Sequence, residues 1–160
     1  MTVPAVGSSA PEMRLRSQYG EPLDLGELLE DGPVLLVFYP FAFSSVCGGE
    51  MHQLIELHDR FRAAGITVVG VSVDSKYALQ AWSMEMGIPF PLAADFWPHG
   101  AVARAYGVFD EDRGMATRGT FLIGASGMVE QVLVHGPAEA RDFTVFLPAG
   151  APAAPDGASH

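Results

Sequence analysis

The stretch Val34–Phe61 constrains the fold of this chain more than any other part of the sequence. It opens with the uninterrupted apolar run Val34–Phe38, which is too short for a buried helix and suits a central strand. Pro40 stops this strand, because proline has no N–H group for a sheet ladder. Ser44 or Ser45 then provides a helix N-cap, and apolar residues at helical spacing continue to the end of the stretch. The sequence therefore predicts a buried strand, a short loop and a helix.

Cys47, the single cysteine of the chain, falls in the first turn of that helix. Unpaired backbone N–H groups and the positive end of the helix dipole favour the thiolate there, and the thiolate is the nucleophile. A lone cysteine is more often a small buried apolar residue than a catalyst. However, Gly48 and Gly49 weaken the helix while keeping side chains away from the sulfur, which a structural cysteine does not need. We therefore interpret Cys47 as reactive.

These residues carry a family resemblance. The pattern Pro40-x-x-x-Ser44-x-x-Cys47 resembles the active-site motif of the peroxiredoxins, with serine in place of the more usual threonine. The run from Cys47 to Glu50 and the segment Asp95–Phe121 are similar to the one-cysteine peroxiredoxins called alkyl hydroperoxide reductase E. The resemblance covers roughly residues 5 to 141.

The resemblance implies a role for each matching residue. Cys47 is the peroxidatic cysteine, and Arg118 approaches it with a permanent charge and several donors for peroxide oxygens. The Ser44 hydroxyl and the Cys47 N–H hold the peroxide, and Pro40 shields the sulfur from water. Glu50 either orients Arg118 or joins a polar network at the site, or it is a simple first-turn carboxylate, and these readings stay open.

The alternation of predicted elements, β–α–β–α–β–α–β–β, is compatible with an α/β, thioredoxin-like fold in which helices flank a central mixed sheet. Val34–Phe38 and the second buried strand, Ile66–Val73, have the spacing of a parallel βαβ unit, with Cys47 at its catalytic end. The other predicted elements are a hairpin over Glu12–Leu23, a helix over Lys76–Met86, a short edge strand at Pro89–Leu92, a polar loop over Asp110–Arg118, and hairpin strands at Gly119–Ile123 and Gly127–Val134.

At 160 residues, 49% of them hydrophobic, the chain has room for one domain with a substantial core. We assign residues 1–147 to this domain. Peroxiredoxins usually end in a helix packed on the sheet, and Phe143–Pro148 does not read as one, so the order of this segment stays open. The Pro/Ala/Gly-rich tail 148–160 is predicted to be disordered.

Composition excludes several classes. Nineteen acidic against nine basic residues give a formal charge of −10, which argues against nucleic-acid and anionic-membrane partners. One cysteine cannot form a disulfide within the chain. The sequence has no visible signal peptide and no apolar stretch near the roughly 20 residues of a membrane span, so we expect a cytoplasmic protein.

Histidines need separate attention, because Cys–His pairs make nucleophilic hydrolases. His52 and His58 lie on the Cys47 helix and His99 in a later loop, and we interpret all three as surface or structural residues. The metal-ligand spacings H-x-x-x-H and C-x-x-C do not occur in the sequence. We expect no metal, haem or flavin cofactor.

We predict a thiol-dependent peroxidase that reduces hydrogen peroxide or organic hydroperoxides through a sulfenic acid on Cys47. With no second cysteine, an external thiol must reduce that acid. The resemblance suggests mycothiol with mycoredoxin, or a thioredoxin-like protein, as reductant, and a homodimer as the assembly. Two alternatives remain: a thioredoxin-fold redox sensor or binding protein oxidised without turnover, and a weaker one, a cysteine-dependent acyl-transfer enzyme, which lacks a placed histidine.

Overall fold

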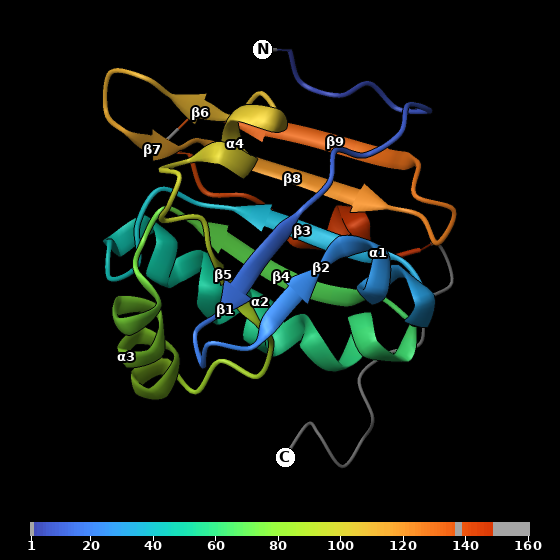
Figure 1. Ribbon diagram of the computed structural model, residues 1–160. Coiled ribbons are helices and arrows are strands. Elements are labelled where there is room, and N and C mark those ends of the chain that lie inside the picture. The colour runs from blue at the N-terminus through green and yellow to red at the C-terminus, as the bar shows by residue number, and fades with distance from the viewer. Residues whose placement is uncertain (1, 137–138, 149–160) are drawn as a thin grey trace.

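The computed structural model describes residues 2–136 and 139–148, so all of the predicted tail except Pro148 lies outside the described residues. A seven-stranded mixed sheet in the order β2-β1-β5-β4-β3-β8-β9 forms its centre (Figure 1). The pairs β3–β4 and β4–β5 are parallel and the other pairs in this sheet are antiparallel. Its strands are β1 (Arg14–Ser17), β2 (Pro22–Asp24), β3 (Val34–Phe38), β4 (Thr67–Ser72), β5 (Leu92–Ala94), β8 (Arg118–Ile123) and β9 (Val129–His135).

Helices flank the sheet, as predicted for an α/β fold (Figure 1). The core on one face contains side chains of α2 and α3, and the core on the other contains side chains of α1 and α4. Within the described residues, no helix is both long and apolar enough to cross a membrane. The helices are α1 (Leu25–Leu28), α2 (Ser45–Ala63), α3 (Lys76–Met86) and α4 (Ala101–Ala105), with the 3-10 turns η1 (Leu29–Asp31) and η2 (Phe143–Phe146).

Strand β3 is buried along its whole length. Its side chains alternate between the two cores: Leu35 and Val37 pack toward α2 and α3, whereas Leu36 and Phe38 pack on the opposite face. Because both faces of the strand are covered, every position is apolar, which explains the uninterrupted run in the sequence.

The unit β3–α2–β4 positions the reactive end of the sheet. Gly65, two residues after the end of α2, has a φ of +77°, a left-handed conformation that glycine adopts without steric cost. This turn leads into β4, whose first residue Thr67 pairs with Val34 in parallel register. The first turn of α2 therefore follows the carboxyl end of β3, where open α/β sheets place their ligands.

The prediction of an edge strand at Pro89–Leu92 is wrong. β5 begins only at Leu92 and lies inside the sheet, between β4 and β1. Proline weakens a ladder only where it occupies a pairing position, and both prolines precede the strand. Pro91 instead contributes its carbonyl oxygen, which accepts a hydrogen bond from the N–H of Gly70 at 3.0 Å.

The predicted polar loop over Asp110–Arg118 contains more structure than expected. A small separate hairpin forms there from β6 (Phe109–Asp110) and β7 (Met115–Ala116). The Oδ1 atom of Asp110 accepts hydrogen bonds from two backbone N–H groups of the turn, at 3.0 and 3.1 Å. Because these charged residues form a turn that an aspartate side chain stabilises, their sequence has the composition of an irregular loop and gave no sign of a hairpin.

The described part of the C-terminal segment, up to residue 148, has no long helix, in agreement with its sequence, but it does pack on the fold. Its only helical part within the described residues is η2, and Phe143 and Phe146 are fully buried in the core beneath α2 and α3. Two buried aromatic side chains therefore fix the position of the chain just after Arg141.

Candidate active site

Cys47 is the third residue of α2 and lies in its first turn. Its residue surface is only 2% exposed, and it packs in the core that β3, α2 and α3 share. A Cβ atom placed on Gly48 or Gly49 would meet no other atom within 4 Å, so packing does not require glycine at either position. The two glycines leave open space beside the first turn of the helix.

Residues 40–44, which we call the active-site loop, connect β3 to α2. Pro40 is buried, and the backbone of Ser44 has the extended conformation of an N-cap. The Ser44 hydroxyl, however, donates to the carbonyl of Phe41 at 3.0 Å instead of accepting from the helix N–H groups. The predicted serine cap is therefore a cap of the backbone only.

The active-site loop holds a strained residue. Phe43 has a φ of 69°, and among the described residues it is the one non-glycine residue with a positive φ. Such a conformation costs about 1 to 3 kcal/mol and persists only where the surrounding structure imposes it. The loop is therefore held in place by contacts outside Phe43 itself.

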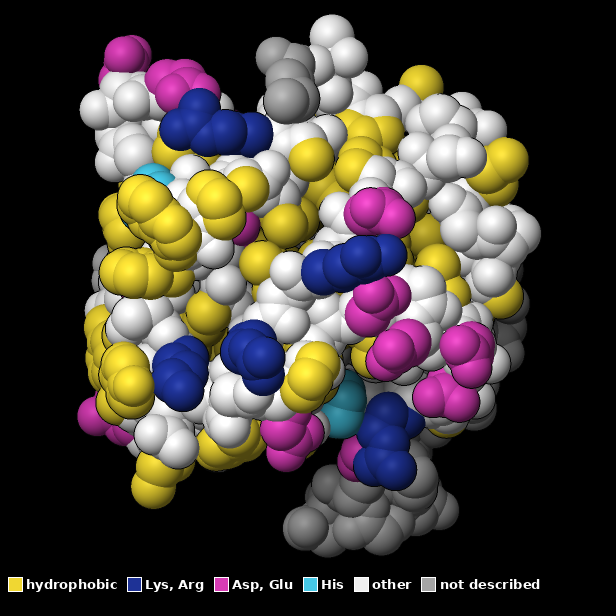
Figure 2. Space-filling model, viewed as in Figure 1, with side chains coloured by type: hydrophobic (Ala, Val, Ile, Leu, Met, Phe, Trp, Pro, Cys, Tyr) yellow, Lys and Arg dark blue, Asp and Glu magenta, His cyan; other side chains and the backbone are white. Residues whose placement is uncertain are grey.

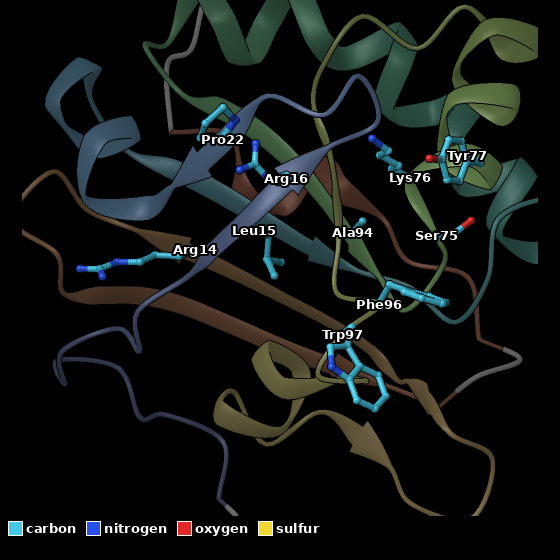
Figure 3. Close-up of a pocket in the computed structure, with 10 residues that line it drawn as sticks. All are labelled: Arg14, Leu15, Arg16, Pro22, Ser75, Lys76, Tyr77, Ala94, Phe96 and Trp97. Carbon is cyan, nitrogen blue, oxygen red and sulfur yellow. The ribbon is translucent and has the colours of Figure 1, made fainter.

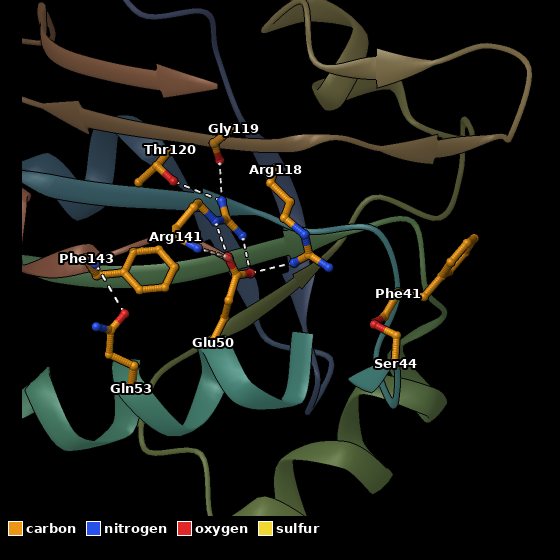
Figure 4. A network of polar contacts seen from close by, with 9 residues as sticks. All are labelled: Phe41, Ser44, Glu50, Gln53, Arg118, Gly119, Thr120, Arg141 and Phe143. Atoms are coloured by element: carbon orange, nitrogen blue, oxygen red, sulfur yellow. Dashed lines mark hydrogen bonds and ion pairs between the residues drawn. The ribbon is translucent and has the colours of Figure 1, made fainter. Parts of the chain in front are cut away.

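Glu50, one helical turn after Cys47, is the centre of a buried cluster (Figure 4). Arg141 donates from Nε to Oε2 and from Nη2 to Oε1 of Glu50, both at 2.8 Å, which is a two-pronged pairing of guanidinium and carboxylate. The backbone N–H of Arg141 also donates to Oε2 at 2.8 Å. Arg118 donates from Nη1 to Oε1 at 2.5 Å. Oε1 of Glu50 is thus shared by the two arginines, whereas the hydrogen bonds to Oε2 come from Arg141.

Arg141 also ties the cluster to the sheet. Its Nη1 donates to the carbonyl of Gly119 at 3.1 Å and to the hydroxyl oxygen of Thr120 at 2.9 Å, both on β8. The C-terminal segment, α2 and β8 therefore meet at one carboxylate, although they lie far apart in the sequence.

The cluster carries a net charge of +1 in a buried place. The side chains of Glu50, Arg118 and Arg141 are at most 3% exposed. Burial alone raises the pKa of Glu50, but the hydrogen bonds and charge of Arg141 and the charge of Arg118 outweigh it, so this pKa lies below its ordinary value. One carboxylate and two guanidinium groups give these three side chains a summed charge of +1.

The sheet brings Arg118 to the same end of the molecule as Cys47. β8 runs antiparallel to β3, and its Thr120 pairs with Val37 near the carboxyl end of β3. Arg118 comes two residues earlier on β8 and so lies toward the active-site loop; Figure 4 shows its guanidinium between Glu50 and that loop. Glu50 accepts a hydrogen bond from Arg118, the residue that it would orient in one reading of the sequence.

Sequence reasoning missed Arg141. It stands 91 residues after Glu50, in no regular element and outside every motif that carried the family resemblance. The aromatic pair that follows it, Phe143 and Phe146, was the one available signal that this part of the chain packs on the core.

The three histidines have ordinary surroundings. His52 is exposed on α2. The His58 ring lies 5.4 Å from that of Phe90, and burial, with the charge of Arg62, lowers its pKa. His99 is exposed, and its Nε2 is 2.7 Å from the carbonyl oxygen of Gly114.

Comparison with known proteins links this geometry to a family. A family model described as the AhpC/TSA family matches residues 6–132. Alkyl hydroperoxide reductase E of Mycobacterium tuberculosis is 40% identical over 144 residues, which cover 90% of this chain and 94% of that protein. The selenocysteine-containing peroxiredoxin PrxU of Peptoclostridium acidaminophilum is 35% identical over 136 residues, covering 79% of this chain and 66% of its own.

Solved structures agree. The crystal structure of peroxidoxin BcpB from Mycobacterium tuberculosis superposes with a TM-score of 0.77 at 30% identity, over 82% of this chain and 86% of that one. The structure of Enterococcus faecalis AhpC gives a TM-score of 0.83 at 25% identity, over 92% and 93%. The predicted thioredoxin-like fold is confirmed.

Glu50→Gln should destabilise the protein by about 3 to 5 kcal/mol, because it removes the buried carboxylate charge that both guanidinium groups share. The free energy of unfolding in urea measures this loss. Glu56→Gln, the same change at an exposed position of α2, is the matched control and should have little effect. A Glu50→Gln protein as stable as wild type would contradict the importance of the buried carboxylate.

The same pair of proteins tests the pKa of Glu50. Because this pKa is lower in the folded state than in the unfolded state, its stabilising contribution is complete above the unfolded value of about 4.3 and disappears as the pH falls through the folded value. The stability difference between wild type and Glu50→Gln should therefore narrow on acidification below about pH 4.

Proposed function

The chain belongs to the AhpC/TSA family, the peroxiredoxins, and from this premise we propose that Cys47 is the nucleophile of a one-cysteine, thiol-dependent peroxidase. The Cys47 thiolate attacks one oxygen of a hydroperoxide, ROOH, and forms a sulfur–oxygen bond. The O–O bond breaks, RO⁻ leaves and takes up a proton to become water or an alcohol, and the cysteine becomes a sulfenic acid. The reaction requires no haem, flavin or metal.

The buried cluster of +1 charge beside the first turn of α2 is the observation that carries this proposal. The guanidinium of Arg118 would stabilise the thiolate before the attack and the negative charge on RO⁻ afterwards. Its pairing with Glu50 fixes the position of the guanidinium group. Donors held in advance contribute most, because they need not reorganise during the reaction.

The active-site loop supplies the remaining proposed contacts. The backbone N–H of Cys47 would donate to a peroxide oxygen. The Ser44 hydroxyl donates its proton in a hydrogen bond to the Phe41 carbonyl, so its oxygen would accept a hydrogen bond from the O–H of the peroxide. Pro40 is buried and would keep bulk water from the sulfur. These roles are specific to the loop conformation described above.

We further propose that an external thiol closes the cycle. The chain has one cysteine, and a direct bond between two Cys47 residues would require two sulfurs in helix first turns to meet within the narrow range of disulfide geometry. The resemblance to alkyl hydroperoxide reductase E suggests mycothiol with mycoredoxin, or a thioredoxin-like protein, as reductant. Such thiols belong to a reducing compartment, so we place the protein in the cytoplasm.

An apolar surface that includes part of the active-site loop supports the proposed homodimer. We call it the aromatic surface; its members, Phe41, Phe43, Tyr77, Phe96 and Trp97, are between 39% and 80% exposed. Figure 2 shows hydrophobic side chains gathered at the left edge of the molecule, where Figure 1 places α3. Tyr77, Phe96 and Trp97 also line a groove of about 580 Å³ (Figure 3). Extended apolar surfaces of this kind are typical of interfaces.

The first test of this function is Cys47→Ser. Serine is nearly isosteric but ionises far less readily, so peroxide consumption with an added thiol should fall to background while circular dichroism stays unchanged. Sustained consumption by wild type also excludes a redox sensor without turnover, and absence of ester or amide cleavage excludes acyl transfer. Appreciable peroxide reduction by the folded serine variant would falsify the assignment of the nucleophile.

The closing step predicts a defined adduct. After one equivalent of peroxide, a small thiol should add one thiol residue per chain at Cys47, seen by mass spectrometry of the intact protein. A glutaredoxin-like protein should then remove it. A covalent dimer on non-reducing gels that turns over with thioredoxin and no small thiol would contradict this route.

Trp97→Glu should dissociate the homodimer, because it places a charge within the aromatic surface. Sedimentation velocity at micromolar concentration measures the assembly. Met128→Glu, at a residue 42% exposed beside the β8–β9 turn, is the matched control and should leave the dimer intact. A wild-type monomer, or equal effects of both changes, would refute an interface at this surface.

A further inference from the structure

Burial of Cys47 creates two opposing requirements. Peroxide attack needs the active-site loop closed, because the proposed contacts of Ser44 and Pro40 exist only there. Reduction of the sulfenic acid needs a larger molecule to reach a residue that is 2% exposed. The loop must therefore open after the first step, and the contacts that hold it closed control when it does.

Asp74 supplies such a contact from outside the loop. It follows β4, and its Oδ2 accepts a hydrogen bond from the N–H of Ala42, at the middle of the active-site loop, at 2.8 Å. The hydroxyl of Ser72 donates to the same oxygen at 2.7 Å and so orients the carboxylate. A hydrogen bond to a carboxylate is roughly twice as strong as one between neutral groups.

The neighbouring residue favours opening. Phe43 follows Ala42 directly and has the strained, left-handed backbone described above, which an open loop would relax. Its ring lies 6.2 Å from that of Trp82 on α3, an adaptable contact of a half-exposed side chain. Among the described residues, the Asp74–Ala42 hydrogen bond is thus a directional restraint on the closed loop, and it acts against strain stored one residue away.

We propose that Asp74 is a positioning residue that holds the active-site loop closed and thereby decides the fate of the sulfenic acid. This inference rests on the proposed peroxidase function. With the loop open, an external thiol R′SH attacks the sulfur, the S–O bond breaks, and Cys47–S–S–R′ and water form. With the loop closed, a second hydroperoxide transfers an oxygen to the sulfenic acid, giving a sulfinic acid and ROH. A stronger hold on Ala42 favours the second path.

Two substitutions separate this role from a general structural one. Asp74→Ala removes the acceptor for the Ala42 N–H. Asp74→Asn keeps a carbonyl oxygen at nearly the same place but loses the charge, so its effects should lie between those of wild type and Asp74→Ala. Asp74 stands two residues before α3. Glu85→Ala, at an exposed position of α3, is therefore a control for the loss of a carboxylate in this part of the chain.

The experiment measures three quantities in each protein. Stopped-flow kinetics give the rate of sulfenic acid formation and the rate of its reaction with a small thiol, and mass spectrometry gives the sulfinic acid formed per turnover. Asp74→Ala should lower the first rate by about tenfold, the scale of one lost hydrogen bond to a charged group, leave the second rate equal or higher, and lower the sulfinic yield. The inference would be overturned if the ratio of the two rates stayed unchanged, for example because both rates fell equally.

Hydrogen exchange tests the contact without any reaction. Backbone amides of residues 41–46 should exchange faster in Asp74→Ala than in wild type, whereas those of β3 and β8 should keep their protection. Unchanged exchange in the loop, or loss of protection throughout the sheet, would refute a local role for Asp74. If wild type failed to consume peroxide, the proposed function would fall while this measurement still reported on the loop.

Discussion

The candidate active site depends on one carboxylate held between two guanidinium groups. Glu50 accepts hydrogen bonds from Arg118, from the side chain of Arg141 and from the Arg141 backbone, and so connects α2, β8 and the C-terminal segment. Buried ion pairs are weak evidence for stability as such, because desolvation offsets much of their attraction. Removing one partner of such a pair is nevertheless costly, because it takes away the counter-charge of a buried group.

The net charge of this cluster also relates to each stage of the proposed cycle. A Cys47 thiolate would balance the +1 of Glu50, Arg118 and Arg141, whereas a protonated sulfenic acid or a mixed disulfide would not. Because arginine stays charged at every physiological pH, the imbalance persists until a thiolate forms again. In the proposed cycle, the same fixed charge would act on Cys47 both as the starting nucleophile and as the leaving group of the final exchange.

Local patterns predicted what is local in this structure. The strand β3, the first-turn position of Cys47 and the helix Lys76–Met86 follow from apolar periodicity and caps, and short motifs identified Arg118. Contacts made across the fold could not be read in the same way. The place of β5 inside the sheet depends on its pairing with β1. The Ser44 hydroxyl donates to the carbonyl of Phe41, three residues earlier, instead of accepting from the helix N–H groups. Arg141 is the clearest example of a contact that local patterns cannot predict, because no neighbouring residue indicates that its partner, Glu50, is 91 residues away.

The position of Arg141 has a consequence for biosynthesis. A ribosome makes β1 to β9 and α2 before it reaches residue 141, so the chain carries Glu50 and Cys47 for most of its synthesis without the arginine that completes their surroundings. During that interval a folded intermediate would bury a carboxylate with one guanidinium partner and an open core where Phe143 and Phe146 belong. Glu50 therefore acquires its full set of hydrogen-bond partners only when translation of the described fold is almost finished.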